Sequence, residues 1–259
     1  MNMSEFYIDL KKSFPTLERA PIVEAVIQWK AVPSVELQEE ALRNQLATAF
    51  QEYGIERQRD IHAIFKESPS GSEMGHSWIW QGFRLTKLSG DKPEFVAQFT
   101  RKGLVFSQLA PYRNWEGFIG EANRFWSEFR DVCRPTQIDG ISTRFISQVL
   151  VSNADEAGEY IEVAAQPLKQ IGISTSNFFH QDKAELRGVP YNVTLVRAVQ
   201  AGKDADRSLL IVDIDVSTRE PLVEFDAAEQ TLRELRFIKN EIFFTVMKMA
   251  REKFGGLST

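Results

Sequence analysis

The sequence predicts an α+β fold in which two similar halves, residues 1–135 and 136–259, share one curved antiparallel sheet with helices on one face. Three observations predict it. Each half opens on a strand-like segment rich in β-branched residues, at 20–30 and at 140–151. Each half then runs in the order helix, three or four strands, helix, and each ends on a long amphipathic helix.

The segment 20–30 is the strand around which we expect the sheet to be organised. Pro21 stands where a strand can begin, and Pro33 follows its end. Alternation places Val23, Ala25, Ile27 and Trp29 on one face. Glu24 lies on the other face, between Ile22 and Val26. Because both faces are largely apolar, the segment is typical of a strand in the middle of a sheet.

The rest of the first half consists of a helix, two pairs of strands and a second helix. Ser34 is expected to cap a helix that runs to about Tyr53. Asn114 is expected to cap a helix that runs to Val132, before Pro135. The strands between them are predicted at residues 55–66, 78–88, 94–100 and 104–109.

The second half repeats this order with a shorter first helix. Asn153 and Glu156 predict a capping box, and Asp226 with Glu229 opens a long final helix. The strands are predicted at residues 140–151, 171–180, 191–199 and 208–217. Since the halves share almost no residue identity, the prediction of an internal duplication rests on the order of elements.

Composition excludes several classes of protein. A net charge of −5 over 259 residues gives no general attraction to nucleic acid or to an anionic membrane, and neither half is a basic module. Cys133 is the single cysteine, so no intrachain disulfide or thiolate metal cluster can form. The N-terminus lacks the uncharged core of a signal peptide, and no apolar run is as long as a membrane span. We therefore expect a cytoplasmic, bacterial protein.

Two short motifs carry a resemblance to a known family. They are Ala-Pro-Ile-Val-Glu-Ala at residues 20–25 and Gly-Ile-Ser-Thr-Arg-Phe-Ile at residues 140–146. With the strand at 210–215 and the final helix containing Phe244, they resemble a sporadically distributed bacterial family of uncharacterised proteins of about this size. The halves also resemble the TATA-binding-protein-like fold. The patchy distribution of that family implies accessory roles, such as bacterial defence or toxin–antitoxin systems.

Glu24 and Arg144 are the first candidate site residues. Each lies on the first strand of a half, between apolar neighbours, where a lone charge is costly to bury. If the two strands meet at the centre of the sheet, the carboxylate and the guanidinium can pair bidentately. We expect this pair to fix how the halves fit together, and a role in ligand binding is the alternative.

Metal and cofactor sites are weakly indicated. Asp213 and Asp215 point to the same side of a predicted strand, which suits a divalent ion, although a solvated strand face fits the pattern better. The three histidines have no zinc-ligand spacing, and no phosphate-binding glycine motif occurs. No cofactor is therefore expected.

Nucleic-acid binding is indicated by aromatic and basic side chains on neighbouring strands. Trp78 and Trp80 are predicted to share a strand face with Arg84. Arg57 and Arg59 come from the strand beside it. Aromatic rings can stack bases while arginine holds phosphate, but nearby acidic residues dilute the charge.

These observations favour a binding function over catalysis. The sheet face that the helices leave free is the expected functional surface. The leading hypothesis is a non-catalytic cytoplasmic interaction protein, an accessory or neutralising component of a defence system, with a protein partner or a second copy of itself. The alternatives are nucleic-acid binding through the open sheet face and a metal-dependent enzyme with an acidic site around Asp213, Asp215 and Glu24. No membrane partner is expected.

Overall fold

The structure is a computed structural model that describes residues 5–68, 71–162, 172, 177–201, 207–248 and 250–257. It is an α+β protein, as the sequence predicts. The elements of the first half are β1 (Thr16–Leu17), β2 (Ile22–Lys30), α1 (Glu39–Ala49), β3 (Gly54–Ser68), β4 (Gly71–Ser89), β5 (Lys92–Thr100), β6 (Gly103–Leu109) and α2 (Trp115–Cys133). Those of the second half are β7 (Gly140–Val151), α3 (Ala154–Tyr160), β8 (Phe178–Glu185), β9 (Tyr191–Ala201), β10 (Ser208–Thr218), α4 (Ala227–Val246), α5 (Ala250–Phe254) and β11 (Gly256–Leu257).

Nine strands form one open antiparallel sheet in the order β3-β4-β5-β6-β2-β7-β10-β9-β8. The first strands of the two halves, β2 and β7, pair at its centre, with Val26 opposite Arg144 and Trp29 opposite Ile141. On each side of this pair the last strand of the half comes next, β6 beside β2 and β10 beside β7. The halves therefore extend outward from the centre in the same relative order.

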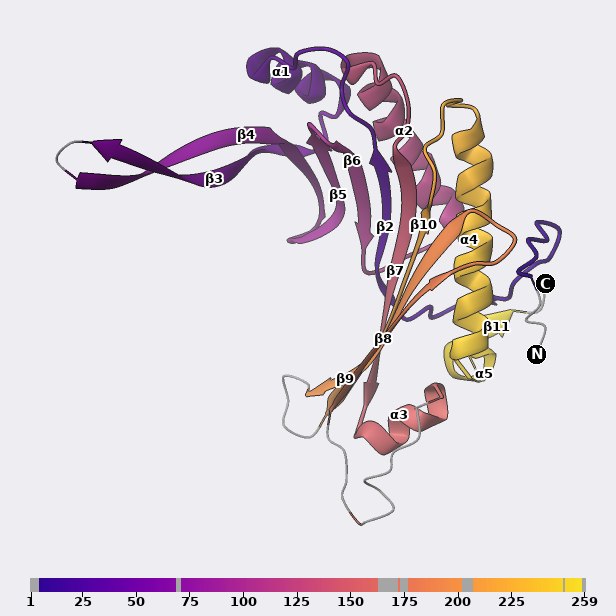
Figure 1. Cartoon of the computed structure of the whole chain (residues 1–259). Helices are drawn as coiled ribbons and strands as arrows, with labels where there is room; N and C mark the ends of the chain where they lie inside the picture. The colour runs from indigo at the N-terminus through magenta and orange to yellow at the C-terminus, as the bar shows by residue number, and fades with distance from the viewer. Residues whose placement is uncertain are drawn as a thin grey trace.

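The helices cover one face of the sheet (Figure 1). On β2, the side chains of Ala25, Ile27 and Trp29 are fully buried, whereas the alternate positions are only half-buried. The Trp29 ring stacks on Trp126 of α2, with ring centroids 5.2 Å apart. Burying a large apolar side chain stabilises a fold by roughly 1.5–3 kcal/mol, so this face supplies most of the core.

Two of the predicted helix caps are present. The Asn114 side chain accepts a hydrogen bond from the Gly117 amide at 2.7 Å, at the start of α2. Asn153 accepts one from the Glu156 amide at 2.9 Å, at the start of α3. These side chains satisfy amide groups that have no partner within the helix. Asp226 stands at the N-cap of α4, but its side chain makes no cap hydrogen bond.

The prediction that Ser34 caps the first helix is wrong, since α1 begins at Glu39 and ends at Ala49. The Ser34 hydroxyl donates instead to the Arg134 carbonyl at 2.5 Å, and the Ser34 amide donates to the Cys133 carbonyl at 3.0 Å. These are carbonyls at the C-terminal end of α2, which lack partners within their own helix. Ser34 therefore stabilises the end of α2.

The β3–β4 hairpin projects beyond the sheet in Figure 1 and is longer than predicted. The register of the pair shifts between Gln58 and Arg59, opposite Gly82. A Cβ at Gly82 would lie 1.8 Å from the Phe99 carbonyl oxygen, so this position requires glycine. In the second half, β8 begins at Phe178; the predicted strand residues 171 and 173–176 lie outside the described residues.

The described helices include none that is long and apolar enough to cross a membrane. The two short strands β1 and β11 pair with each other and hold the N-terminal segment against the end of the chain. This pairing places residues 10–22 beside α4, where they help to enclose the candidate site.

Candidate binding site between α2 and α4

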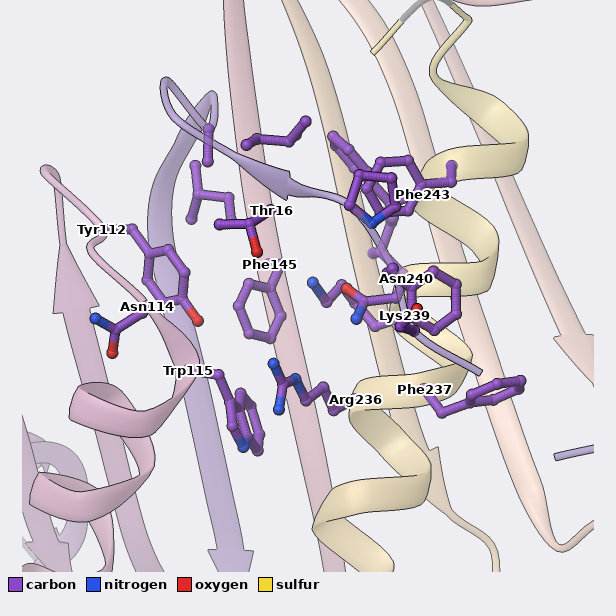
Figure 2. A pocket seen from close by; sticks show the side chains of 18 of the residues that line it. Thr16, Tyr112, Asn114, Trp115, Phe145, Arg236, Phe237, Lys239, Asn240 and Phe243 are labelled. Carbon is purple, nitrogen blue, oxygen red and sulfur yellow. The ribbon is translucent and has the colours of Figure 1, made fainter. Parts of the chain in front are cut away.

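A cavity of about 790 Å³ lies on the helix-covered side of the sheet, where the two halves meet. Its walls come from the N-terminal segment at 10–22, the start of α2, the strand β7 and the helix α4 (Figure 2). Small-molecule sites commonly measure roughly 300–1,000 Å³. The cavity is therefore large enough for a small organic ligand.

Aromatic rings form one side of this cavity. Phe145 of β7 is 2% exposed and lies on the same face as Ala25, its partner across β2. The Tyr112 ring meets Phe145 edge-on at 5.8 Å, and the Trp115 ring stacks beside it at 6.4 Å. Figure 2 shows the three rings together. They offer flat apolar surfaces to an aromatic or apolar part of a ligand.

Lys239 extends from α4 toward these rings. Its side chain is buried, with 9% of the residue exposed, and its Nζ lies 4.2 Å from the centre of the Phe145 ring. Among the described residues, none forms an ion pair or hydrogen bond with this amine. Burial, and secondarily the charge of Arg236, lower the pKa of Lys239 to about 7. Lys239 is thus a buried amine that faces a cavity without a counter-charge.

Other cations surround the mouth of the cavity. The Arg236 guanidinium lies 5.3 Å from the centre of the Trp115 ring, and its Nη1 is 3.3 Å from Oε1 of Glu116. The remaining basic residues in the lining are Lys11, Lys12, Arg113 and Arg233, while Glu116 is the acidic one. Four of these cations already have carboxylate partners: Lys12 with Glu241, Arg113 with Glu94, Arg233 with Glu229 and Arg236 with Glu116. The attraction of the cavity for an anionic ligand therefore depends mainly on Lys239.

Tyr112 adds a neutral hydrogen-bond donor. Burial raises the pKa of its phenol well above the ordinary value of 10.0. The hydroxyl therefore stays protonated at neutral pH and can donate a hydrogen bond to a ligand oxygen. The cavity thus combines two cations, a phenol donor and aromatic walls.

The residues predicted first, Glu24 and Arg144, lie on the opposite face of the same strands. Their strands are neighbours, as the hypothesis required, but the carboxylate that Arg144 contacts is that of Asp213. Arg144 Nε lies 2.9 Å from Asp213 Oδ1, and Nη2 lies 2.6 Å from Oδ2. Glu24 and Asp213 are both paired in register with Ile146, on opposite sides of β7, so each lies diagonal to Arg144, and the ion pair forms with Asp213. The predicted Glu24–Arg144 ion pair is therefore replaced by Arg144–Asp213.

Asp215 lies directly opposite Arg144 on β10. Its Oδ1 is buried without a hydrogen-bond partner, and burial raises the pKa of this carboxyl. Asp213 is engaged by Arg144, and within the described part of the chain no three His, Cys, Asp or Glu side chains group closely enough to hold a metal ion. The metal site at Asp213 and Asp215 stays a prediction without further ligands.

The structure divides the predicted nucleic-acid residues between two faces. The register shift in the β3–β4 pair separates Trp80, which contacts the buried Phe83 ring at 5.5 Å, from Arg84, which lies opposite Glu56. The shared face predicted for Trp78, Trp80 and Arg84 is therefore interrupted. Trp78 is 60% exposed.

Two of the predicted arginines, Arg57 and Arg59, lie on β3, the strand that pairs with β4. Arg59 is paired in register with Trp80. Arg57 Nε forms an ion pair at 2.6 Å with Glu39 of α1, so this guanidinium already has a carboxylate partner.

The sequence carries one signal for the cavity besides the predicted site residues. Lys239 follows Leu235 by four residues and precedes Ile242 by three, so it interrupts the apolar stripe of α4 with a charge. Trp115 is the first residue of α2, and its ring, which is buried, also lines the cavity. No pattern in the sequence indicates Arg236 as a site residue.

Comparisons with known proteins identify no family for this chain. No family model matches the chain, and no curated protein matches it. Among solved structures, it is similar to the crystal structure of DynU16, a protein in the dynemicin biosynthetic locus, with 12% sequence identity and a TM-score of 0.16. That match covers 89% of this chain and 99% of DynU16. The similarity is too low to support an argument about fold or function.

Proposed function

We propose that this protein is a non-catalytic binding protein whose ligand is a small anion with an aromatic or apolar part, held in the cavity between α2 and α4. The observation that carries the proposal is Lys239. This amine is buried, faces the cavity and has no counter-charge among the described residues. Keeping a lone charge in such a place is unfavourable unless something compensates for it.

An anionic ligand supplies that compensation. A carboxylate or phosphate beside Lys239 would favour the protonated amine and raise its pKa from about 7 toward the ordinary value. Arg236 and the Tyr112 hydroxyl line the same cavity and can hold further oxygens of the anion. Charge-assisted hydrogen bonds of this kind are strong because little water screens them.

The aromatic walls select the rest of the ligand. Tyr112, Trp115 and Phe145 present ring faces and edges around the cavity, and the buried Phe237 and Phe243 of α4 also line it. An aromatic acid can stack on these rings while its acidic group reaches the cations. A purely inorganic anion would leave the rings without a partner.

Titration calorimetry with phenylacetate, phenyllactate and phenyl phosphate tests this proposal. We expect binding by the unaltered protein and at least a tenfold loss of affinity in Lys239→Met and in Arg236→Gln. Because ligand binding takes a proton onto Lys239, the binding heat should depend on the ionisation enthalpy of the buffer.

Two matched variants serve as controls. Lys253 lies 4.7 Å from the centre of the Tyr160 ring, and Arg130 lies 5.2 Å from that of Phe225, so each resembles a cavity cation but stands outside the lining. Lys253→Met and Arg130→Gln should leave the affinity unchanged. Absence of binding by the unaltered protein, or equal losses in both sets of variants, would contradict the proposal.

The arrangement of strands supports, as a second proposal, an internal duplication with a TATA-binding-protein-like order of elements. The two first strands pair, and each half continues outward with its last strand. If the chain is such a duplication, the cavity lies where the two copies join, between the last long helix of each, α2 and α4. The division at residue 135 belongs to this proposal.

A protein partner or a second copy on the exposed sheet face is an alternative proposal. The large apolar side chains of Leu150 and Phe179 are 57% and 67% exposed on strands β7 and β8. Measurement of the mass in solution, with Leu150→Glu as the disrupting variant, tests self-association. A role in defence or toxin–antitoxin systems stays a prediction from the family resemblance, and nucleic-acid binding stays one to be tested by its dependence on salt.

A further inference from the structure

The amine of Lys239 has the surroundings of a reactive lysine. Lysine becomes nucleophilic when burial and a neighbouring cation favour its uncharged form. Lys239 has both, since it is 9% exposed and Arg236 lies on the same helix three residues before it. Without a ligand, a large share of this amine is unprotonated at neutral pH, because its pKa is about 7, and a ligand whose acidic group is held by Arg236 leaves the amine uncharged.

The cavity leaves room for a reaction partner beside the amine. Lys239 enters the space between Phe145 and α4, and Figure 2 shows Arg236 beside it on the same side of the helix. The Arg236 guanidinium can hold an acidic group, and the aromatic walls can hold a ring. A ligand fixed at those two points can bring a carbonyl carbon to Lys239 Nζ, which lies 4.2 Å from the centre of the Phe145 ring.

We propose that Lys239 Nζ forms a reversible imine with the carbonyl carbon of an aromatic 2-oxo acid or aromatic aldehyde acid bound in the cavity between α2 and α4. This inference rests on the proposed function and names the class of ligand that it would serve. The covalent bond would retain a ligand that the ion pair and stacking alone would release more quickly.

The step balances without another reactant. The lone pair of the uncharged amine attacks the carbonyl carbon, and a carbon–nitrogen bond forms. The carbonyl oxygen then leaves as water with the two amine protons, and a carbon–nitrogen double bond remains. Addition of water reverses the step, and no oxidant or reductant takes part.

Other lysines of the described chain lack this combination of features. Lys253 is paired with Glu159 at 3.3 Å, and Lys12 is paired with Glu241 at 2.5 Å. Lys183 and Lys30 are exposed on strands. Amines that are exposed or paired with carboxylates are mostly protonated at neutral pH and react slowly. The reaction should therefore be selective for Lys239.

Reductive trapping tests the inference. The full chain is incubated at pH 7.5 with phenylpyruvate or 4-carboxybenzaldehyde and sodium cyanoborohydride, and adducts are located by intact and peptide mass spectrometry. We expect one adduct per chain, at Lys239, at least tenfold slower in Arg236→Gln. Excess phenyllactate, which has a hydroxyl in place of the carbonyl, should suppress it.

Two variants separate this inference from the proposed function. Lys239→Arg keeps the positive charge but cannot form an imine, so it should still bind phenyllactate and form no adduct. Lys253→Met should form the adduct at the normal rate. Binding of phenyllactate by the unaltered protein without an adduct at Lys239, or labelling spread over exposed lysines, overturns the imine alone. If phenyllactate does not bind and no adduct forms, both proposals fail.

Discussion

The two faces of β7 differ in whether the cation beside them has a carboxylate partner. Arg144 points to the exposed face and holds Asp213 through two hydrogen-bonded contacts. Phe145, the next residue, points to the covered face, where the amine of Lys239 lies over its ring and has no counter-charge among the described residues. On the exposed face, the fold itself supplies the carboxylate that neutralises Arg144. A buried amine with no carboxylate among the described residues is not explained in this way, and the proposed anionic ligand rests on it.

The largest expected effect on stability comes from truncating Phe145, on the covered face of β7. Phe145→Ala should lower the free energy of unfolding by about 3–5 kcal/mol, since it deletes a buried ring that contacts Tyr112, Trp115 and Phe118. Urea denaturation monitored by tryptophan fluorescence measures the change.

Leu150→Ala on the same strand is the control for Phe145→Ala. Leu150 is 57% exposed, so its truncation should change the free energy of unfolding by less than about 0.5 kcal/mol. Equal losses in the two variants would show that the two faces of β7 are not buried as differently as the structure indicates.

A smaller effect is expected from the ion pair on the exposed face. Asp213→Asn removes the charge that Arg144 holds and should lower the free energy of unfolding by about 1–2 kcal/mol. Asp215→Asn should have the opposite or no effect, because burial disfavours the Asp215 charge and its Oδ1 has no hydrogen-bond partner. Urea midpoints at pH 7 distinguish them.

Asp131→Asn, at an exposed position on α2, controls for the loss of one negative charge. It should leave the urea midpoint unchanged. If Asp215→Asn destabilised the protein as much as Asp213→Asn, Arg144 would depend on both carboxylates and the comparison between its two partners would need revision.

The smallest expected effect is on the pH dependence of the free energy of unfolding. In the folded protein Lys239 loses its proton near pH 7, whereas the unfolded chain keeps it until about 10.5. Between these values the unfolded state binds more protons, so the Lys239 contribution makes stability rise with pH, by at most about 1.4 kcal/mol per pH unit. Lys239→Met should remove this part of the slope between pH 7 and 9, as measured by thermal or urea unfolding.

The other groups around Lys239 do not produce the same slope. Tyr112 stays protonated in this range, because burial raises its pKa. The other charged residues of the lining are Lys11, Lys12, Arg113, Arg233, Arg236 and Glu116. An identical slope in Lys239→Met and in the unaltered protein would mean that the amine keeps its ordinary pKa in the folded state.

Local patterns predicted much of the secondary structure. The alternation at residues 20–30 gave the buried face of β2, and Asn114 gave the start of α2, because both depend on residues close together in the chain. Ser34 gave the wrong helix start, since its partners are the carbonyls of Cys133 and Arg134. Those carbonyls lie about 100 residues away in sequence, where no local pattern reports them.

The candidate site was predicted less well than the fold. The sequence predicts that Arg144 needs a partner, but Glu24 and Asp213 both lie diagonal to it on the two neighbouring strands, and the ion pair forms with Asp213. The Lys239 side chain interrupts an apolar stripe, which marks it as unusual. Its meeting with Phe145 and Trp115 depends on three elements far apart in the sequence.

By itself, the order and periodicity of residues determined that this protein is α+β, that its first strand lies within a sheet, and that its long helices have buried faces, because burial of apolar side chains imposes periods that can be read directly. The tertiary structure decided which charges are neutralised and which are left alone in a cavity. Charge pairing depends on distances between side chains of different strands and helices, and those distances exist only once the sheet and helices have packed.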